Sequence, residues 1–122
     1  DGLQGLVATY GLRLDGTPTT MDLGLLYPAL LAGRIEMGAA SRTDGLLARP
    51  EFTALNDDRN YFPPYECALV VREETFTRLP ALRGVLRELS GRIDEARMRT
   101  MNAAVDIDKR PVAEVAREFL RN

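Results

Sequence analysis

The chain has 122 residues, a formal net charge of -2 and a hydrophobic content of 45%, which fits one small domain or a segment of a larger protein. Charges of both signs alternate along it, so no nucleic-acid footprint is expected, and no apolar run reaches the roughly 18 to 20 residues that span a bilayer. The absence of histidine excludes Ser-His-Asp and Cys-His catalysis and histidine-ligated metals, so we expect neither an enzyme nor a cofactor.

Two helices are predicted in the first third of the chain. Residues 3–12 carry apolar side chains at helical spacing and end near Gly11, a residue suited to the left-handed end of a helix. Residues 21–32 are apolar on nearly every side and are followed by Gly33, which predicts a largely buried helix. Pro28 lies inside this segment and predicts a kink or a late helix start.

Three short segments are predicted to be strands, at residues 35–41, 52–58 and 67–71. The last segment, with the sequence CALVV, is continuously apolar and gives the clearest strand pattern. Its first residue, Cys67, is the only cysteine of the chain. We expect a buried, inert thiol there, because no histidine is present to activate it.

The second half of the chain is predicted to be mostly helical. Residues 81–91 place apolar side chains on one face and end at Gly91. Asp94 is a good N-cap for the next helix, and Pro111 is suited to the first position of the last one. Since strands interleave with helices before this helical part, the expected fold class is α/β.

One turn, with the sequence RTDG at residues 42–45, stands between a small-residue strand and a helix start. Ligands often bind where a strand leads into a helix N-terminus, because free N–H groups and the positive end of the helix dipole point outward there. A simpler interpretation is more common, namely an N-cap formed by Thr43 or Asp44 beside a solvated Arg42. The pattern alone leaves both interpretations open.

Three of the eight aromatic residues, Tyr61, Phe62 and Tyr65, flank the pair Pro63-Pro64. Aromatic rings at such a position most often pack a tight corner. However, prolines restrict the backbone and reduce the entropy lost in fixing the rings. Rings held in this way suit a quaternary ammonium group, whose attraction requires ring faces within about 6 Å of the cation.

The carboxylates of Asp44, Asp57 and Asp58 do not have the spacing of a metal site. The sequence around them lacks the EF-hand pattern, and adjacent aspartates before a turn are usually solvated. We therefore expect no metal ligands and no catalytic residues.

A series of motifs resembles the substrate-binding proteins of ABC importers for glycine betaine, choline and carnitine, the osmoprotectant-uptake class. The motifs are DGLQGL and YGLRL, MDLGLLYPALLAGRIEM, the TDG turn, LNDDRNYFPPY, LVVREETF and VAREFL, in this order over nearly the whole chain. A single motif such as TDG is weak, whereas the whole series at these separations is specific.

This resemblance implies a type II periplasmic-binding-protein fold, a two-lobed clamshell that closes on its ligand, represented here by an incomplete C-terminal portion. Residues 1–62 would form most of the inserted ligand-binding lobe, and residues 63–122 the hinge crossing and part of the other lobe. The N-terminal half, with its signal or lipid anchor, would not be included, and the start DGLQG has no signal-peptide pattern. The protein would be extracytoplasmic, periplasmic or membrane-anchored, and would deliver its solute to ABC permease subunits.

The resemblance also implies ligand-binding residues. The family holds the trimethylammonium group in a cage of tyrosines, one of which corresponds to Tyr65, the last residue of FPPY. Another cage tyrosine precedes the (S/T)TDG turn, and this position is Ser41 here. With Arg42 and Thr43, Ser41 would make a more polar site that can hydrogen-bond an anionic or zwitterionic group. Simple choline is thereby disfavoured, while a betaine-type zwitterion, a larger quaternary amine and another polar solute all remain open.

Two other interpretations accompany this one. The same bilobal fold occurs in effector-sensing domains of transcriptional regulators, which is the alternative function, and an enzyme is the least favoured. An isolated segment of this kind also has open strand edges, which two copies can cover by pairing as a homodimer.

Overall fold

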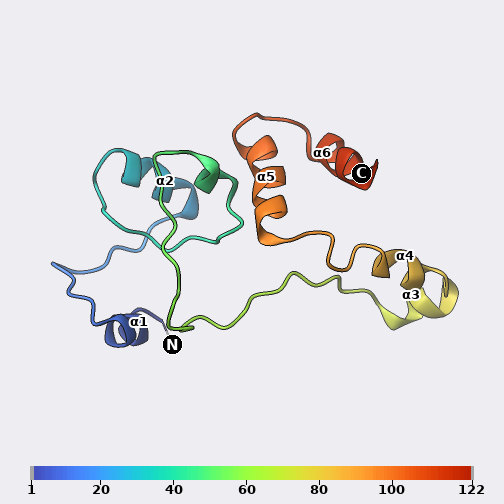
Figure 1. Ribbon diagram of the computed structural model, residues 1–122, viewed down its shortest axis with the longest axis horizontal. Helices are drawn as coiled ribbons and strands as arrows, with labels where there is room; N and C mark the ends of the chain where they lie inside the picture. The colour runs from blue at the N-terminus through green and yellow to red at the C-terminus, as the bar shows by residue number, and fades with distance from the viewer. Residues whose placement is uncertain (1, 122) are drawn as a thin grey trace. The chain divides into compact units, whose positions relative to one another are not determined.

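The computed structural model describes residues 2–121, and every regular element within them is a helix (Figure 1). In chain order the elements are α1 (Leu3–Tyr10), α2 (Leu23–Leu31), the 3-10 helix η1 (Gly45–Ala48), α3 (Glu73–Arg78), α4 (Leu82–Arg87), α5 (Glu95–Asp106) and α6 (Val112–Arg121). Among these described residues, no helix combines the length and the apolar character that a bilayer crossing requires.

The predicted helix ends at Gly11 and Asp94 are confirmed, whereas the one at Gly91 is not. Gly11 ends α1 with φ 63°, in the left-handed region that favours glycine. Gly91 also has a positive φ of 74°, but α4 ends at Arg87, so the prediction of a helix that runs to Gly91 is wrong. Asp94 is the N-cap of α5, and its carboxylate accepts a hydrogen bond from the Arg97 amide at 2.7 Å. Pro111 directly precedes α6, where its missing N–H has no cost.

The apolar helix α2 is buried in its middle rather than throughout. It begins after Asp22, whose carboxylate accepts from the Gly24 amide at 2.8 Å. Pro28 lies inside the helix, which already begins at Leu23, so a late helix start at this proline is wrong and a kink stays a prediction. The buried side chains are Leu26, Tyr27 and Ala29, and the exposed leucines are Leu23, Leu25 and Leu31. The prediction of a largely buried helix is therefore only partly confirmed.

The three predicted strands at residues 35–41, 52–58 and 67–71 do not form in residues 2–121, so those predictions are wrong for this structure. A strand is stabilised by ladder hydrogen bonds to a neighbouring strand. Residues 67–71 make no backbone hydrogen bond with the rest of the described chain. The expected α/β class is accordingly not seen here, because the strand pattern finds no partner.

The same missing partner explains the exposure of the apolar run. Leu69 and Val70 are 62% and 96% exposed, although their sequence context is typical of a buried strand. Cys67 is also exposed, so the prediction of a buried thiol is wrong. Its burial depended on a strand that does not form here.

Contacts divide the described chain into two units. The first comprises residues 2–38 and Ala54–Cys67, and the second comprises Ala39–Thr53 and residues 68–121. Each unit is described by itself. The lobe boundary predicted between residues 62 and 63 concerns the complete fold and stays a prediction.

In the second unit, α5 packs against both η1 and α6. On α6, Val115 is buried, and the Phe119 ring is covered by two guanidinium groups. The guanidinium carbons of Arg92 and Arg97 lie 5.1 and 5.9 Å from the ring centroid. These cation–π contacts link Phe119 of α6 to Arg97 of α5 and to Arg92, which precedes α5.

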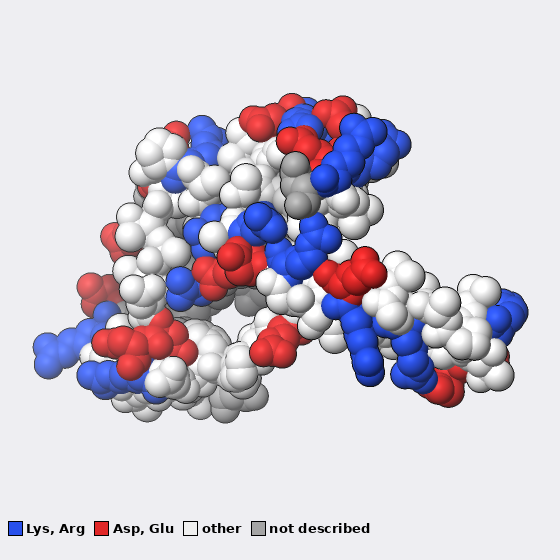
Figure 2. Space-filling model, turned by 45° about the vertical axis from the view of Figure 1, so that its right-hand side comes forward, with Lys and Arg blue, Asp and Glu red and all other residues white. Residues whose placement is uncertain are grey.

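Acidic and basic side chains are interspersed on the face drawn in Figure 2, rather than gathered in large patches of one sign. This agrees with the formal net charge of -2. A binding surface that tracks a nucleic-acid backbone would require a continuous basic stripe.

Candidate functional site

The turn of residues 41–44 is closed by its own polar groups. The Asp44 amide donates to the Ser41 carbonyl at 2.9 Å, and the Ser41 amide donates to the Asp44 carboxylate at 3.2 Å. The hydroxyls of Ser41 and Thr43 lie 3.0 Å apart and share a hydrogen bond. Asp44 occupies the N-cap position of η1, but its side chain makes no capping hydrogen bond there, so the prediction of a capping oxygen is not confirmed. The turn thus carries two adjacent hydroxyl groups.

Two side chains of α5 donate hydrogen bonds to two backbone carbonyl groups of this turn. The Asn102 side-chain amide donates to the Thr43 carbonyl at 2.8 Å, and the Arg99 Nε donates to the Arg42 carbonyl at 2.7 Å. Backbone carbonyls require a hydrogen-bond partner when they are removed from water. The turn therefore depends on α5 for the hydrogen bonds that fix its orientation.

Gly45 allows the closest approach between η1 and α5. A Cβ atom at this position would lie 2.6 Å from the backbone carbon of Asn102 and 2.6 Å from the backbone nitrogen of Ala103. Gly45 itself is buried. Since backbone atoms cannot move aside as a flexible side chain can, only glycine fits this contact.

The guanidinium group of Arg42 contacts a carboxylate on α5 but is still more than half exposed, so the structure does not overturn the interpretation of a solvated arginine. Its Nε lies 3.0 Å from the Glu95 carboxylate, and the same carboxylate oxygen lies 2.7 Å from Arg99. The Arg42 and Glu95 side chains are 54% and 44% exposed, so the ion pair is screened and weak.

Sequence reasoning missed Glu95, Arg99 and Asn102 as parts of this site. The pair Glu95 and Arg99 has the i,i+4 spacing of a helix-surface ion pair and is visible in the sequence. The link to the turn is not visible, because Arg42 and Glu95 are 53 residues apart.

A second loop is organised around the carboxylate of Asp57. It accepts hydrogen bonds from the Tyr10 hydroxyl and from the amides of Tyr61 and Phe62, at 2.9 and 2.8 Å for the amides. The hydrogen bond from Tyr10 and those from the amides hold the pKa of Asp57 below its ordinary value. Asp57 is therefore not the solvated turn residue that the sequence predicts.

Arg59 ties the same loop to the end of α1. Its guanidinium donates to the Thr9 carbonyl and lies 5.4 Å from the centre of the Tyr10 ring. Its amide donates to the Tyr10 hydroxyl at 3.2 Å. Desolvation and the hydrogen bond to Asp57 raise the pKa of Tyr10.

Two of the three clustered aromatic rings have packing roles. The Tyr61 hydroxyl donates to the Gly2 carbonyl at 2.6 Å, and its ring covers Gly5 of α1. The Phe62 ring meets Tyr61 edge-on, with 5.0 Å between centroids. These two rings form the tight corner that the sequence suggested as the common interpretation.

Tyr65 differs from the other two aromatic residues, because 86% of it is exposed. It belongs to the first unit, whereas the predicted ligand-binding residues Ser41, Arg42 and Thr43 belong to the second. The structure brings those three together in one turn. The role of all four residues in binding a ligand stays a prediction.

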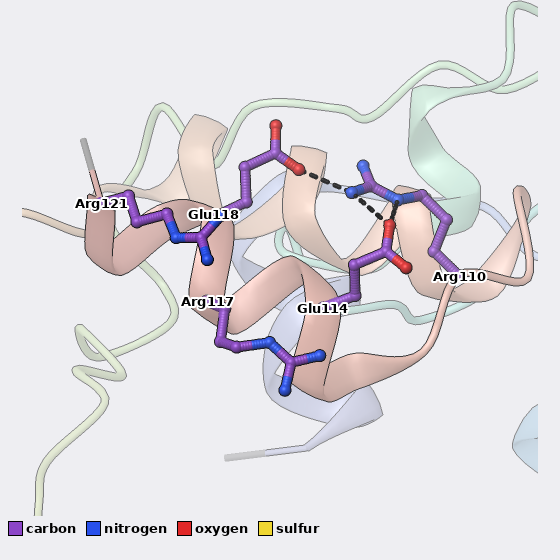
Figure 3. Close-up of a pocket in the computed structure, with 5 residues that line it drawn as sticks. All are labelled: Arg110, Glu114, Arg117, Glu118 and Arg121. Carbon is purple, nitrogen blue, oxygen red and sulfur yellow. Dashed lines mark hydrogen bonds and ion pairs between the residues drawn. The ribbon is translucent and has the colours of Figure 1, made fainter.

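A charged depression on α6 has the wrong lining for a quaternary ammonium group (Figure 3). Arg110 bridges Glu114 at 2.9 Å and Glu118 at 2.5 Å, and Arg117 extends away from this network. These ion pairs raise the pKa of Arg110. The lining residues are Arg110, Glu114, Arg117, Glu118 and Arg121, which include no aromatic ring. The turn of residues 41–44 in the second unit and, separately, Tyr65 in the first unit stay the predicted ligand-binding groups.

Comparison with known proteins identifies the class. Residues 1–122 match the family described as "Substrate binding domain of ABC-type glycine betaine transport system". The chain is 38% identical over 122 residues to a glycine-betaine-binding protein of Pseudomonas aeruginosa, covering 99% of this chain and 39% of the relative. It is 30% identical over 101 residues to the carnitine transport binding protein OpuCC of Listeria monocytogenes, covering 83% and 33%.

A more distant relative is named as an ergothioneine transport permease/ergothioneine binding protein, EgtU of Helicobacter pylori, at 27% identity over 120 residues, covering 98% of this chain and 22% of the relative. The matches define a substrate-binding domain of an ABC transporter. The chain belongs to the family of substrate-binding domains of glycine betaine transport systems, which have the periplasmic-binding-protein fold. It spans less than two fifths of the length of each relative named here.

Replacing Gly45 with alanine should loosen the turn from α5. The added Cβ meets backbone at 2.6 Å, and overpacking of this kind costs about 1 to 3 kcal/mol of unfolding free energy. Gly84→Ala is the matched control, because nothing lies within 4 Å of its Cβ position on α4. Urea unfolding should show a lower free energy of unfolding for Gly45→Ala but not for Gly84→Ala. An equal free energy of unfolding in the two variants would contradict the close approach of Gly45 to α5.

The Asp57 cluster predicts a specific acid sensitivity. Because the folded-state pKa of Asp57 lies below its ordinary value of 3.8, the ionised carboxylate stabilises the fold above that pH. This contribution is lost as the pH falls through the lowered pKa. Tyr10→Phe removes the largest cause of the lowering, so its urea midpoint should fall less steeply with acid than that of the wild type.

Tyr61→Phe is the control for this acid sensitivity, since it removes a hydroxyl bonded to the Gly2 carbonyl rather than to Asp57. It should leave the pH dependence of the urea midpoint unchanged. A parallel pH dependence for the wild type and Tyr10→Phe would show that Tyr10 does not lower the pKa of Asp57.

Proposed function

We propose that this chain is part of the solute-binding component of an ABC importer, which captures a quaternary-amine or betaine-type osmoprotectant and delivers it to permease subunits. The family match over residues 1–122 supports this function. So do the names of the relatives, which bind glycine betaine, carnitine or ergothioneine. The work of such a protein is binding, closure and release outside the cytoplasm, in the periplasm or at a membrane anchor.

The observation that carries the proposal is the exposed ring of Tyr65, in a chain that belongs to this family. The neighbouring rings of Tyr61 and Phe62 are used in packing, whereas Tyr65 stands after Pro63-Pro64 with 86% of its surface free. An exposed ring face can attract a trimethylammonium group, and the attraction is strongest when the bound ligand excludes water from the ring.

The turn of residues 41–44 supports a zwitterion as the solute. The hydroxyls of Ser41 and Thr43 lie 3.0 Å apart, and both can donate to one carboxylate when the hydrogen bond between them is exchanged for it. Arg42 is directed along α5 by Glu95, so we assign the carboxylate contact to the two hydroxyls first and to the guanidinium second. Glycine betaine and carnitine both carry such a carboxylate, whereas choline does not.

We also propose that the chain is one segment of a two-lobed α/β clamshell, with residues 1–62 in one lobe and 63–122 in the hinge and the other lobe. The exposed apolar run at residues 67–71 supports this, because it has the composition of a strand and no partner among residues 2–121. The greater length of the relatives would provide neighbouring strands. A pairing between two copies of the chain is the other way to cover this run, and it stays a prediction.

The alternative function, an effector-sensing domain of a transcriptional regulator, receives no support from the relatives described above, whose names are those of transport proteins. An enzymatic role has no supporting observation either, and the names of these relatives describe transport and binding.

Tyr65→Ala should weaken binding of glycine betaine by the complete protein. A desolvated cation–π contact is worth about 1 to 2 kcal/mol, which corresponds to roughly tenfold in Kd. Tyr65→Phe is the matched control, since it keeps the ring face and should retain most of the affinity. Calorimetry that gives one Kd for all three proteins would exclude Tyr65 from the binding site.

Ser41→Tyr should raise the affinity for choline, if the missing ring explains the predicted preference for zwitterions. One added ring face is worth about 0.5 to 2 kcal/mol, or about two- to thirtyfold in Kd. Ser41→Leu supplies bulk without an aromatic face and should give no gain. The idea fails if a folded Ser41→Tyr protein binds choline no better than Ser41→Leu.

A further inference from the structure

We propose that α5 carries positioning residues for solute binding, with Asn102 and Arg99 fixing the 41–44 turn and Glu95 directing Arg42 away from it. The proposal rests on the proposed function and adds to it a set of residues that never touch the solute. These residues act through the hydroxyl groups of the turn.

The two carbonyl contacts fix two consecutive peptide planes. A trans peptide is planar, and its C=O and N–H groups point in opposite directions. When Arg99 holds the Arg42 carbonyl, the Thr43 amide of the same plane is directed to the other side. When Asn102 holds the Thr43 carbonyl, the Asp44 amide is directed likewise.

These two amides in turn meet Ser41. The Asp44 amide donates to the Ser41 carbonyl at 2.9 Å, and the Thr43 amide approaches the Ser41 hydroxyl oxygen at 3.5 Å. The Ser41 hydroxyl also shares a hydrogen bond with the Thr43 hydroxyl. A contact made on α5 is therefore transmitted through two peptide planes to the paired hydroxyls.

The contact with Asn102 should have the largest effect. Asn102 is half-buried, whereas the ion pair between Arg42 and Glu95 is about half exposed, where ion pairs contribute little. The backbone of Asn102 also lies directly against Gly45, so its side chain cannot shift far without moving η1. A change of this side chain that preserves its shape therefore tests the proposal most directly.

Asn102→Asp keeps the size of the side chain and replaces the N–H donor with an oxygen that repels the Thr43 carbonyl. In the complete protein, we expect the Kd for glycine betaine to rise about tenfold, because a carbonyl loses its donor and the hydroxyl pair is displaced. The Kd for choline should change by less than about threefold, since choline has no carboxylate for the hydroxyls to bind. Calorimetry with both solutes measures this difference.

Two further variants complete the experiment. Gln4→Glu makes the same amide-to-carboxylate change on the exposed face of α1 and should leave both Kd values unchanged. Arg99→Met keeps the aliphatic stem and removes the bond to the Arg42 carbonyl, and it should weaken glycine betaine binding about threefold. If Asn102→Asp does not fold, Arg99→Met decides the question with the same two solutes.

The outcomes distinguish a failure of the proposed solute-binding function from a failure of the positioning role of α5. A wild-type protein that binds neither solute refutes the proposed function and, with it, this proposal. If the wild type binds, an unchanged Kd for glycine betaine in Asn102→Asp overturns the positioning role alone. An equal loss for both solutes together with a lower melting temperature also overturns it, because a merely structural role would affect both solutes alike.

Discussion

Two side chains of α5 hold two carbonyls of the 41–44 turn, and the geometry of the candidate site depends on this interaction. The 3-10 helix that follows the turn is four residues long and has weaker hydrogen-bond geometry than an α-helix, so it cannot orient the turn alone. In contrast, α5 has twelve residues and a capped N-terminus at Asp94. A short loop thus acquires a defined orientation from a longer, better stabilised helix.

The loop after residue 56 is fixed by a hydrogen-bond acceptor side chain, whereas the 41–44 turn is fixed by donor side chains. Here a carboxylate, that of Asp57, accepts hydrogen bonds from loop amides, whereas at the turn side-chain donors satisfy loop carbonyls. Both arrangements satisfy backbone groups that have no partner in a helix or a sheet. In the second loop the result is a corner packed by Tyr61 and Phe62, from which the chain continues through two prolines to the exposed Tyr65.

The parts of the fold that sequence predicts well are those decided within a few residues. Gly11 ends a helix because of its own φ, and Asp94 caps a helix through an amide three residues away. The strand at residues 67–71 was wrongly predicted for this structure, because a strand depends on a partner that the local pattern does not specify. The bond between Tyr10 and Asp57 spans 47 residues, and no spacing rule indicates it.

The charges around the turn bear on which solute it suits. Arg42 and Arg99 contribute two positive charges, and Glu95 and Asp44 contribute two negative ones, so the turn and its support have no net charge. A simple cation more than about 10 Å away gains little attraction from such a neutral group, since the opposite charges offset one another and salt screens what is left. A zwitterion is neutral as well, and its recognition depends on directed contacts, a ring for the ammonium group and hydroxyls for the carboxylate. For this reason the orientation of Ser41 and Thr43, rather than the local charge, would decide between a betaine and choline.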